Sequence, residues 1–137
     1  MEVHYENAKK IDSIRNKIEE WKEILPKDKY MFLVGILMNS ADFVSNTAGT
    51  YGAYLKIWRS MALKPLKLEK GEFIKEGTIE LYVDDVINFL ENKPKADIVY
   101  MDPPYNTRQY PANFSPLESI VVNDNQPLNG KTRTKKL

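Results

Sequence analysis

The residues best suited to chemistry stand together at Asp102-Pro103-Pro104-Tyr105-Asn106, directly after the apolar run 98–100. The two prolines have a fixed φ and no backbone N–H, so their carbonyls stay free to accept hydrogen bonds from a ligand. Asp102 adds a carboxylate acceptor, and Tyr105 adds an aromatic face on which a ring could stack. These groups together favour a flat ring that bears an amino group.

The position of this turn supports a binding role. A β-branched and aromatic run closed by prolines is typical of a buried strand in a parallel sheet. Ligands of open α/β sheets bind beyond the carboxyl ends of the strands, where residues 102–106 fall. The competing interpretation is structural, with a proline-stiffened turn in which Asp102 caps a helix. The following Tyr105 and Asn106 favour binding.

The segment before the turn predicts a β-α-β unit. Residues 79–83 alternate apolar and polar side chains as a strand does, Asp84-Asp85 can cap a helix over 86–91, and residues 92–94 end it. A right-handed crossover then brings both strand ends to one edge of the sheet. From the pattern alone, Asp85 is expected to act as a carboxylate at the N-terminus of this helix.

The N-terminal half predicts helices. Apolar residues at three- and four-residue spacing indicate a helix over 6–25 that Pro26 ends. A second helix, capped by Asp28, is expected over 29–45 with Phe32, Leu33, Ile36, Leu37 and Val44 inside. A third is expected after Gly49 with one face made of Tyr51, Tyr54, Leu55, Trp58 and Met61.

Near the C-terminus, a last helix over 115–122 is expected to begin with Ser115 as its cap and Pro116 at its first position.

Length and composition exclude some classes of protein but do not indicate a substrate. The 137 residues suffice for one ordinary domain, and the net charge of +1 gives no bulk attraction to nucleic acid. There is no cysteine, no signal-peptide pattern, and no apolar run long enough to span a bilayer. We expect a cytoplasmic protein. His4, the single histidine, has no catalytic pattern around it.

Asp102-Pro103-Pro104-Tyr105 matches at every position the catalytic loop of amino-methylating DNA methyltransferases, their motif IV. The stretches 46–56, 106–110 and 130–132 also resemble one subfamily, the Dam-like adenine-specific DNA methyltransferases of type II restriction-modification systems. The resemblance covers about residues 6–132. It implies an α/β fold, namely part of a Rossmann-like methyltransferase sheet preceded by a helical segment.

The resemblance also implies a division of the chain and a set of site residues. The division is a helical segment over 1–64, a partial catalytic core over 65–125, and a basic tail over 126–137 that we expect to be disordered. The implied cofactor is S-adenosylmethionine and the implied substrate is double-stranded DNA. The implied residues are Asp102, Pro103, Pro104 and Tyr105 for catalysis, Asp85 and Asp102 for the cofactor, and Asn106, Arg108, Lys56 and Arg59 for DNA.

The sequence departs strongly from this family. It contains no Phe-x-Gly-x-Gly segment, which in the family holds the methionine part of the cofactor. We therefore expect an internal piece of such an enzyme that is inactive alone, with a complementary chain as a partner that could carry the missing motif. Two alternatives stay open: a fragment of an RNA guanine methyltransferase, which can share residues 102–105, and a helical remnant without catalytic function.

Overall fold

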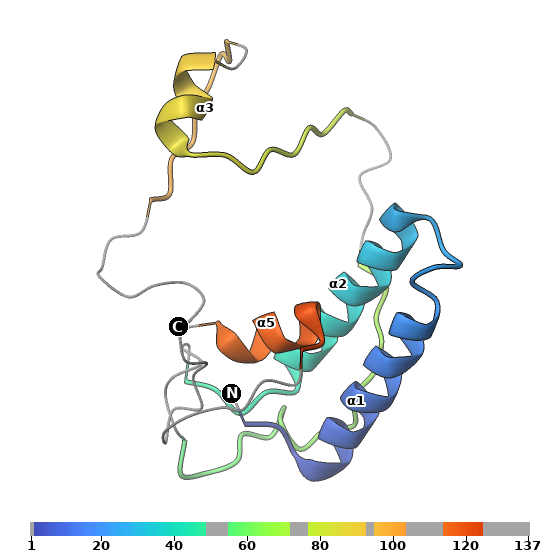
Figure 1. Ribbon diagram of the computed structural model, residues 1–137. Helices are drawn as coiled ribbons and strands as arrows, with labels where there is room; N and C mark the ends of the chain where they lie inside the picture. Colours follow the sequence, from blue (N-terminus) through green and yellow to red (C-terminus); the bar gives the residue numbers. More distant parts are fainter. Residues whose placement is uncertain (1, 49–54, 72–76, 93–94, 104–113, 125–137) are drawn as a thin grey trace. The chain divides into compact units, whose positions relative to one another are not determined.

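The structure, a computed structural model, describes residues 2–48, 55–71, 77–92, 95–103 and 114–124. These residues form four helices, α1 (Tyr5–Glu20), α2 (Lys27–Phe43), α3 (Val86–Asn92) and α5 (Ser115–Val122) (Figure 1). Contacts divide the chain into two units. The first comprises Met1–Gly71 and Arg108–Leu137, and the second comprises Glu72–Thr107.

The first unit is built on a hairpin of α1 and α2, two helices that the spacing of apolar residues predicts (Figure 1). α1 ends at Glu20, five residues earlier than expected, and the chain continues in turns to Leu25. α2 begins directly after Pro26 and has no side-chain cap. The expected cap at Asp28 is therefore wrong. The fixed φ of proline sets the helix start, and Tyr30 N–H donates to the Pro26 carbonyl at 3.0 Å.

The core of this unit lies between α1, α2 and α5. α2 buries one face at three- and four-residue spacing through Val34, Leu37 and Ala41. Phe32, expected inside, is 38% exposed because its position falls beside that face. The buried apolar residues that form this contiguous core are Ile11, Ile18, Val34, Leu37, Ala41, Val44, Leu66 and Ile120. Burial of this set supplies the main favourable free energy of folding in this unit.

α5 packs on α2 and is held at its C-terminal end by α1. Arg15, buried in α1, donates from Nε to the Ile120 carbonyl at 2.6 Å and from Nη2 to the Val121 carbonyl at 3.1 Å. These carbonyls belong to the last turn of α5, which has no helical partner for them. Glu19 pairs with the same guanidinium at 2.8 Å. A buried cation thus completes the C-terminal hydrogen bonds of α5.

The start and end of α5 differ slightly from the prediction. The helix spans residues 115–122 as expected, but Phe114 occupies the cap position and Ser115 is already helical, so Ser115 as the cap is wrong. At the other end Asn123 takes a left-handed conformation with φ of 57°. Asparagine tolerates this conformation better than most residues do, so the helix ends there.

The expected third helix is absent from its described part, residues 55–64, which form bends and a turn. The buried Asn46 side chain accepts from the Arg59 N–H at 3.0 Å and donates to the Ile57 carbonyl at 3.4 Å. These backbone groups are engaged by a side chain, and a helix would instead need them for its own ladder. Tyr51 and Tyr54 lie outside the described residues.

A second buried asparagine holds the next stretch of the same segment. The Asn7 amide donates to the Lys64 carbonyl at 2.8 Å, and its oxygen accepts from the Leu66 N–H at 2.8 Å. Leu66 is 8% exposed and packs in the core. One side chain on α1 therefore binds residues 64–66 as a neighbouring strand would.

The second unit contains α3, which confirms the helix predicted over 86–91. Tyr82 packs edge-on against Phe89 of α3, with ring centroids 5.5 Å apart. Residues 78–85 and 95–103 form no helix and no paired strand within the described part of this unit. None of the described residues of this unit is buried. The Rossmann-like sheet therefore stays a prediction.

Candidate active site

Asp85 acts as the N-terminal cap of α3. Its Oδ1 accepts from the Ile87 N–H at 2.9 Å and from the Asn88 N–H at 3.3 Å, the two positions that a cap residue serves. Asp84 accepts from the Asp85 N–H at 2.9 Å and from the Asn88 amide at 2.8 Å. The structural role weighed for Asp85 is thus confirmed. Its Oδ2 makes no hydrogen bond to any residue that the structure describes, so this oxygen can still accept from a ligand.

Asp102 and Pro103 lie at the end of the apolar run and are exposed, as is every described residue from 95 to 103. Ile98 is 87% exposed and Tyr100 is 88% exposed. Such exposure is unusual for a run with the composition of a buried strand. The other predicted residues of the turn and its continuation lie outside the described residues: Pro104, Tyr105, Asn106 and Arg108.

Lys56 and Arg59, predicted to contact DNA, are exposed in the first unit. The Arg59 guanidinium donates from Nη1 to the Thr47 carbonyl at 2.9 Å, which ties its head to the chain after α2. Both residues line a shallow cavity of about 520 Å³ together with Trp58 and Leu55. The Trp58 ring meets the ring of His4 edge-on at 5.8 Å. His4 has a packing role here, and the DNA roles of Lys56 and Arg59 stay predictions.

Three polar residues that the sequence analysis did not single out organise this unit, namely Asn7, Arg15 and Asn46. Each is at most 3% exposed. A signal for the first two exists in the sequence. Asn7 and Arg15 fall on the same helical face as Ile11 and Ile18, so polar side chains interrupt an apolar stripe and must find partners there. Asn46 has no such signal.

The described residues contain no group of three or more His, Cys, Asp or Glu side chains arranged to hold a metal ion. No helix in the described part of the chain is long and apolar enough to cross a membrane.

The family model of the D12 class N6 adenine-specific DNA methyltransferases matches residues 1–137. The chain belongs to this family. The resemblance carried by Asp102-Pro103-Pro104-Tyr105 and its flanking stretches is therefore confirmed.

Curated relatives carry matching names. The chain is 46% identical over 130 residues to the type II methyltransferase M.NlaIII of Neisseria lactamica, a match that covers 93% of this chain and 39% of the relative. It is 41% identical over 135 residues to the modification methylase StsI of Streptococcus sanguinis, covering 97% of this chain and 20% of the relative. It is 43% identical over 122 residues to the type II methyltransferase M.CviAII of Paramecium bursaria Chlorella virus 1, covering 85% of this chain and 35% of the relative.

The chain thus spans between 20% and 39% of the length of these three relatives. No solved structure matches it.

Proposed function

We propose that this chain forms the part of an adenine-specific DNA methyltransferase that holds the reacting amino group. The observation that carries the proposal is the family match over residues 1–137, which includes an intact Asp102-Pro103-Pro104-Tyr105 loop. The amino group of adenine is not accessible inside a stacked duplex, so the target base has to be flipped out of it.

The residues of the loop suit a flipped adenine. Tyr105 stacks on the ring, and the Asp102 carboxylate and the Pro103 carbonyl accept hydrogen bonds from its amino group. Both are acceptors, so they orient the amino hydrogens toward the protein and leave the nitrogen lone pair directed outward. They also stabilise the positive charge that develops on this nitrogen during transfer.

The acidic residues present fit S-adenosylmethionine as a cofactor. Asp85 keeps one carboxylate oxygen without a hydrogen bond to the described residues, and Asp102 is exposed. Carboxylates are natural acceptors for the adenine amino group and the ammonium group of this molecule. When bound, it supplies an electrophilic methyl group on its sulfonium sulfur.

The cofactor assignment is tested by calorimetric titration of protein that contains this chain with S-adenosylmethionine. Asp85→Asn keeps a capping oxygen for α3 but removes the charge, so it should weaken binding without unfolding the helix. Asp84→Asn is the matched control. Equal binding by wild type and Asp85→Asn would remove Asp85 from the cofactor site.

The exposed apolar residues of the second unit support a requirement for further chain. Leu81 is 91% exposed, Val83 fully exposed and Ile98 87% exposed. We propose that neighbouring strands cover these side chains. The strands come either from further chain, such as the relatives have, or from a complementary chain that carries the glycine-rich segment. Residues 79–83 and 98–100 then form adjacent parallel strands of a Rossmann-like sheet.

The substrate class is tested by transfer of a labelled methyl group to DNA and to RNA of the same sequence. The proposal predicts label on DNA, in N6-methyladenine. Label on guanine in RNA would favour the RNA methyltransferase alternative. Unchanged methylation after Asp102→Ala would favour a non-catalytic role for this chain.

A further inference from the structure

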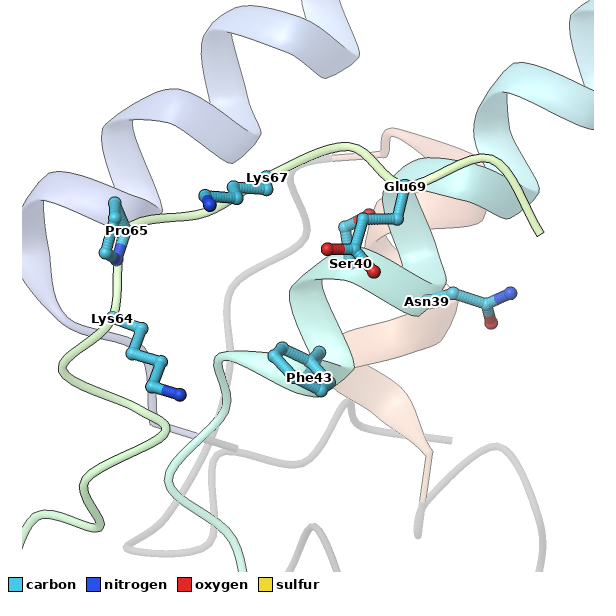
Figure 2. Close-up of a pocket in the computed structure, with 7 residues that line it drawn as sticks. All are labelled: Asn39, Ser40, Phe43, Lys64, Pro65, Lys67 and Glu69. Carbon is cyan, nitrogen blue, oxygen red and sulfur yellow. The ribbon is translucent and has the colours of Figure 1, made fainter.

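A pocket of about 550 Å³ lies in the first unit between the C-terminal half of α2 and residues 64–69 (Figure 2). We call it the α2 pocket. α2 contributes Asn39 and Phe43, and the facing segment contributes Lys64, Lys67 and Glu69. The volume is within the range of small-ligand sites. No function described above uses this pocket.

Both walls of the α2 pocket are fixed by the core. The Asn7 amide binds the backbone at Lys64 and Leu66, and the Leu66 side chain enters the core. The flanking residues of this segment are exposed in consequence. On the other side, α2 buries Ala41 while Phe43 stays 60% exposed. The backbone of both walls is therefore positioned before any ligand arrives, which lowers the entropic cost of binding.

The charges of the pocket suit one phosphodiester. Lys64 and Lys67 form no ion pair within the described residues, and Glu69 forms none either. Two lysines and one glutamate give the described lining a net charge of +1. One phosphodiester carries a charge of −1 and therefore neutralises it. A nucleoside triphosphate would bring several negative charges to this lining, and the described residues that line the pocket include no glycine-rich phosphate loop to bind them.

The remaining groups suit a nucleobase. An exposed phenylalanine ring offers a stacking face that any base can use. Asn39 and Glu69 carry the amide and carboxylate groups that hydrogen-bond base edges in nucleic-acid complexes. The cations, the ring and the polar side chains therefore form the set of groups needed for one nucleotide whose base is unpaired.

We propose that the α2 pocket binds one unpaired nucleotide of a DNA strand, with its phosphate at Lys64 and Lys67 and its base against Phe43. The choice of DNA over RNA rests on the proposed function. The described residues that line the pocket all belong to the first unit, and neither Asp102 nor Pro103 is among them. It is thus a second nucleotide contact in addition to the target adenine.

The phosphate contact is tested by fluorescence anisotropy of the 137-residue chain with a labelled single-stranded DNA over a range of salt concentrations. Loss of one phosphate contact lowers the slope of log K against log salt by about 0.7, which raises Kd about fivefold at 0.1 M salt. Lys64→Ala with Lys67→Ala should show this change. Lys27→Ala with Lys29→Ala removes the same charge at the other end of α2 and should show a smaller change in slope.

The base contact is tested in the same assay with Phe43→Ala. Loss of a stacked base should raise Kd roughly 5- to 150-fold. Tyr5→Ala is the matched control, since Tyr5 is an aromatic residue of similar exposure at 66%, against 60% for Phe43. Lys64→Arg with Lys67→Arg keeps both charges and should bind as wild type does, and circular dichroism of each variant confirms the helices.

Three results would overturn the proposal. They are equal slope changes in the two lysine pairs, an unchanged Kd after Phe43→Ala, and tighter binding of RNA than of DNA. The anisotropy assay measures DNA binding and does not depend on methyl transfer. A methyltransferase that is inactive but binds DNA through this pocket would contradict the proposed function alone, whereas an active one that binds normally without Lys64 and Lys67 would contradict the pocket alone.

Discussion

Asn7 and Asn46 show how single side chains determine the path of a long irregular segment. Each buried amide binds the backbone at two positions, Asn7 at Lys64 and Leu66, and Asn46 at Ile57 and Arg59. A buried amide that loses its partners costs more free energy than the bond itself contributes. These side chains therefore replace the hydrogen bonds of a regular element.

Replacing Asn7 by alanine should lower the free energy of unfolding by about 2–4 kcal/mol, because the Lys64 carbonyl and the Leu66 N–H lose their partners. Urea denaturation measures the change. Asn16→Ala, at an exposed position of the same helix, should change stability by less than about 0.5 kcal/mol. Equal effects of the two substitutions would show that the Asn7 hydrogen bonds contribute nothing to stability.

Glu19 should make stability depend on pH in the acid range. Hydrogen bonds from Lys22, Tyr30 and Arg15 lower the pKa of this carboxyl from 4.5 to about 2. Because the folded pKa lies below the unfolded one, the contribution is complete above pH 4.5 and is lost as pH falls toward 2. The stability difference between wild type and Glu19→Gln should shrink over that interval. A difference that does not change with pH would contradict the assignment, and Glu20→Gln serves as the control for loss of charge.

Helices were predictable from apolar spacing or from residues typical of a helix start. The positions of α1 and α2 follow from apolar spacing, that of α3 from the capping pattern at Asp84-Asp85, and that of α5 from Pro116. Their ends were less predictable, because turns and the proline before α2 set them. The predicted third helix is absent from residues 55–64 for a different reason. Its aromatic spacing is helical, but Asn46 occupies the backbone groups that the helix would need.

α5 depends on one cation from another element. Replacing Arg15 by methionine leaves the Ile120 and Val121 carbonyls unpaired and should cost about 3 kcal/mol. Hydrogen exchange of the α5 amides should become faster than that of α2. Lys17→Met, an exposed substitution on the same helix, should leave both rates unchanged. Unchanged exchange in α5 after Arg15→Met would mean that apolar packing alone holds this helix.

At the scale of the whole molecule, the two units differ in what their apolar residues contact. The first unit buries its apolar faces within itself, and the second buries none of its described residues. The apolar composition of residues 79–83 and 98–100 predicts strands, and a strand needs a neighbouring strand for its backbone hydrogen bonds.

Hydrogen exchange can test whether those neighbours exist outside this chain. The amides of residues 79–83 and 98–100 should exchange rapidly in the isolated chain, because no described strand pairs with them. They should become protected when this chain replaces the 46%-identical segment of the Neisseria lactamica relative. Rapid exchange in both proteins would contradict the proposed sheet.

The same chimera provides the most direct measurement, the amount of N6-methyladenine that it forms in DNA with S-adenosylmethionine. We predict that the chimera methylates adenine and that Asp102→Ala lowers the rate by roughly 100-fold or more. Asp97→Ala, an exposed aspartate five residues earlier, should leave the rate nearly unchanged. A folded chimera without methylation, or one that keeps its rate without Asp102, would contradict the assignment of this loop.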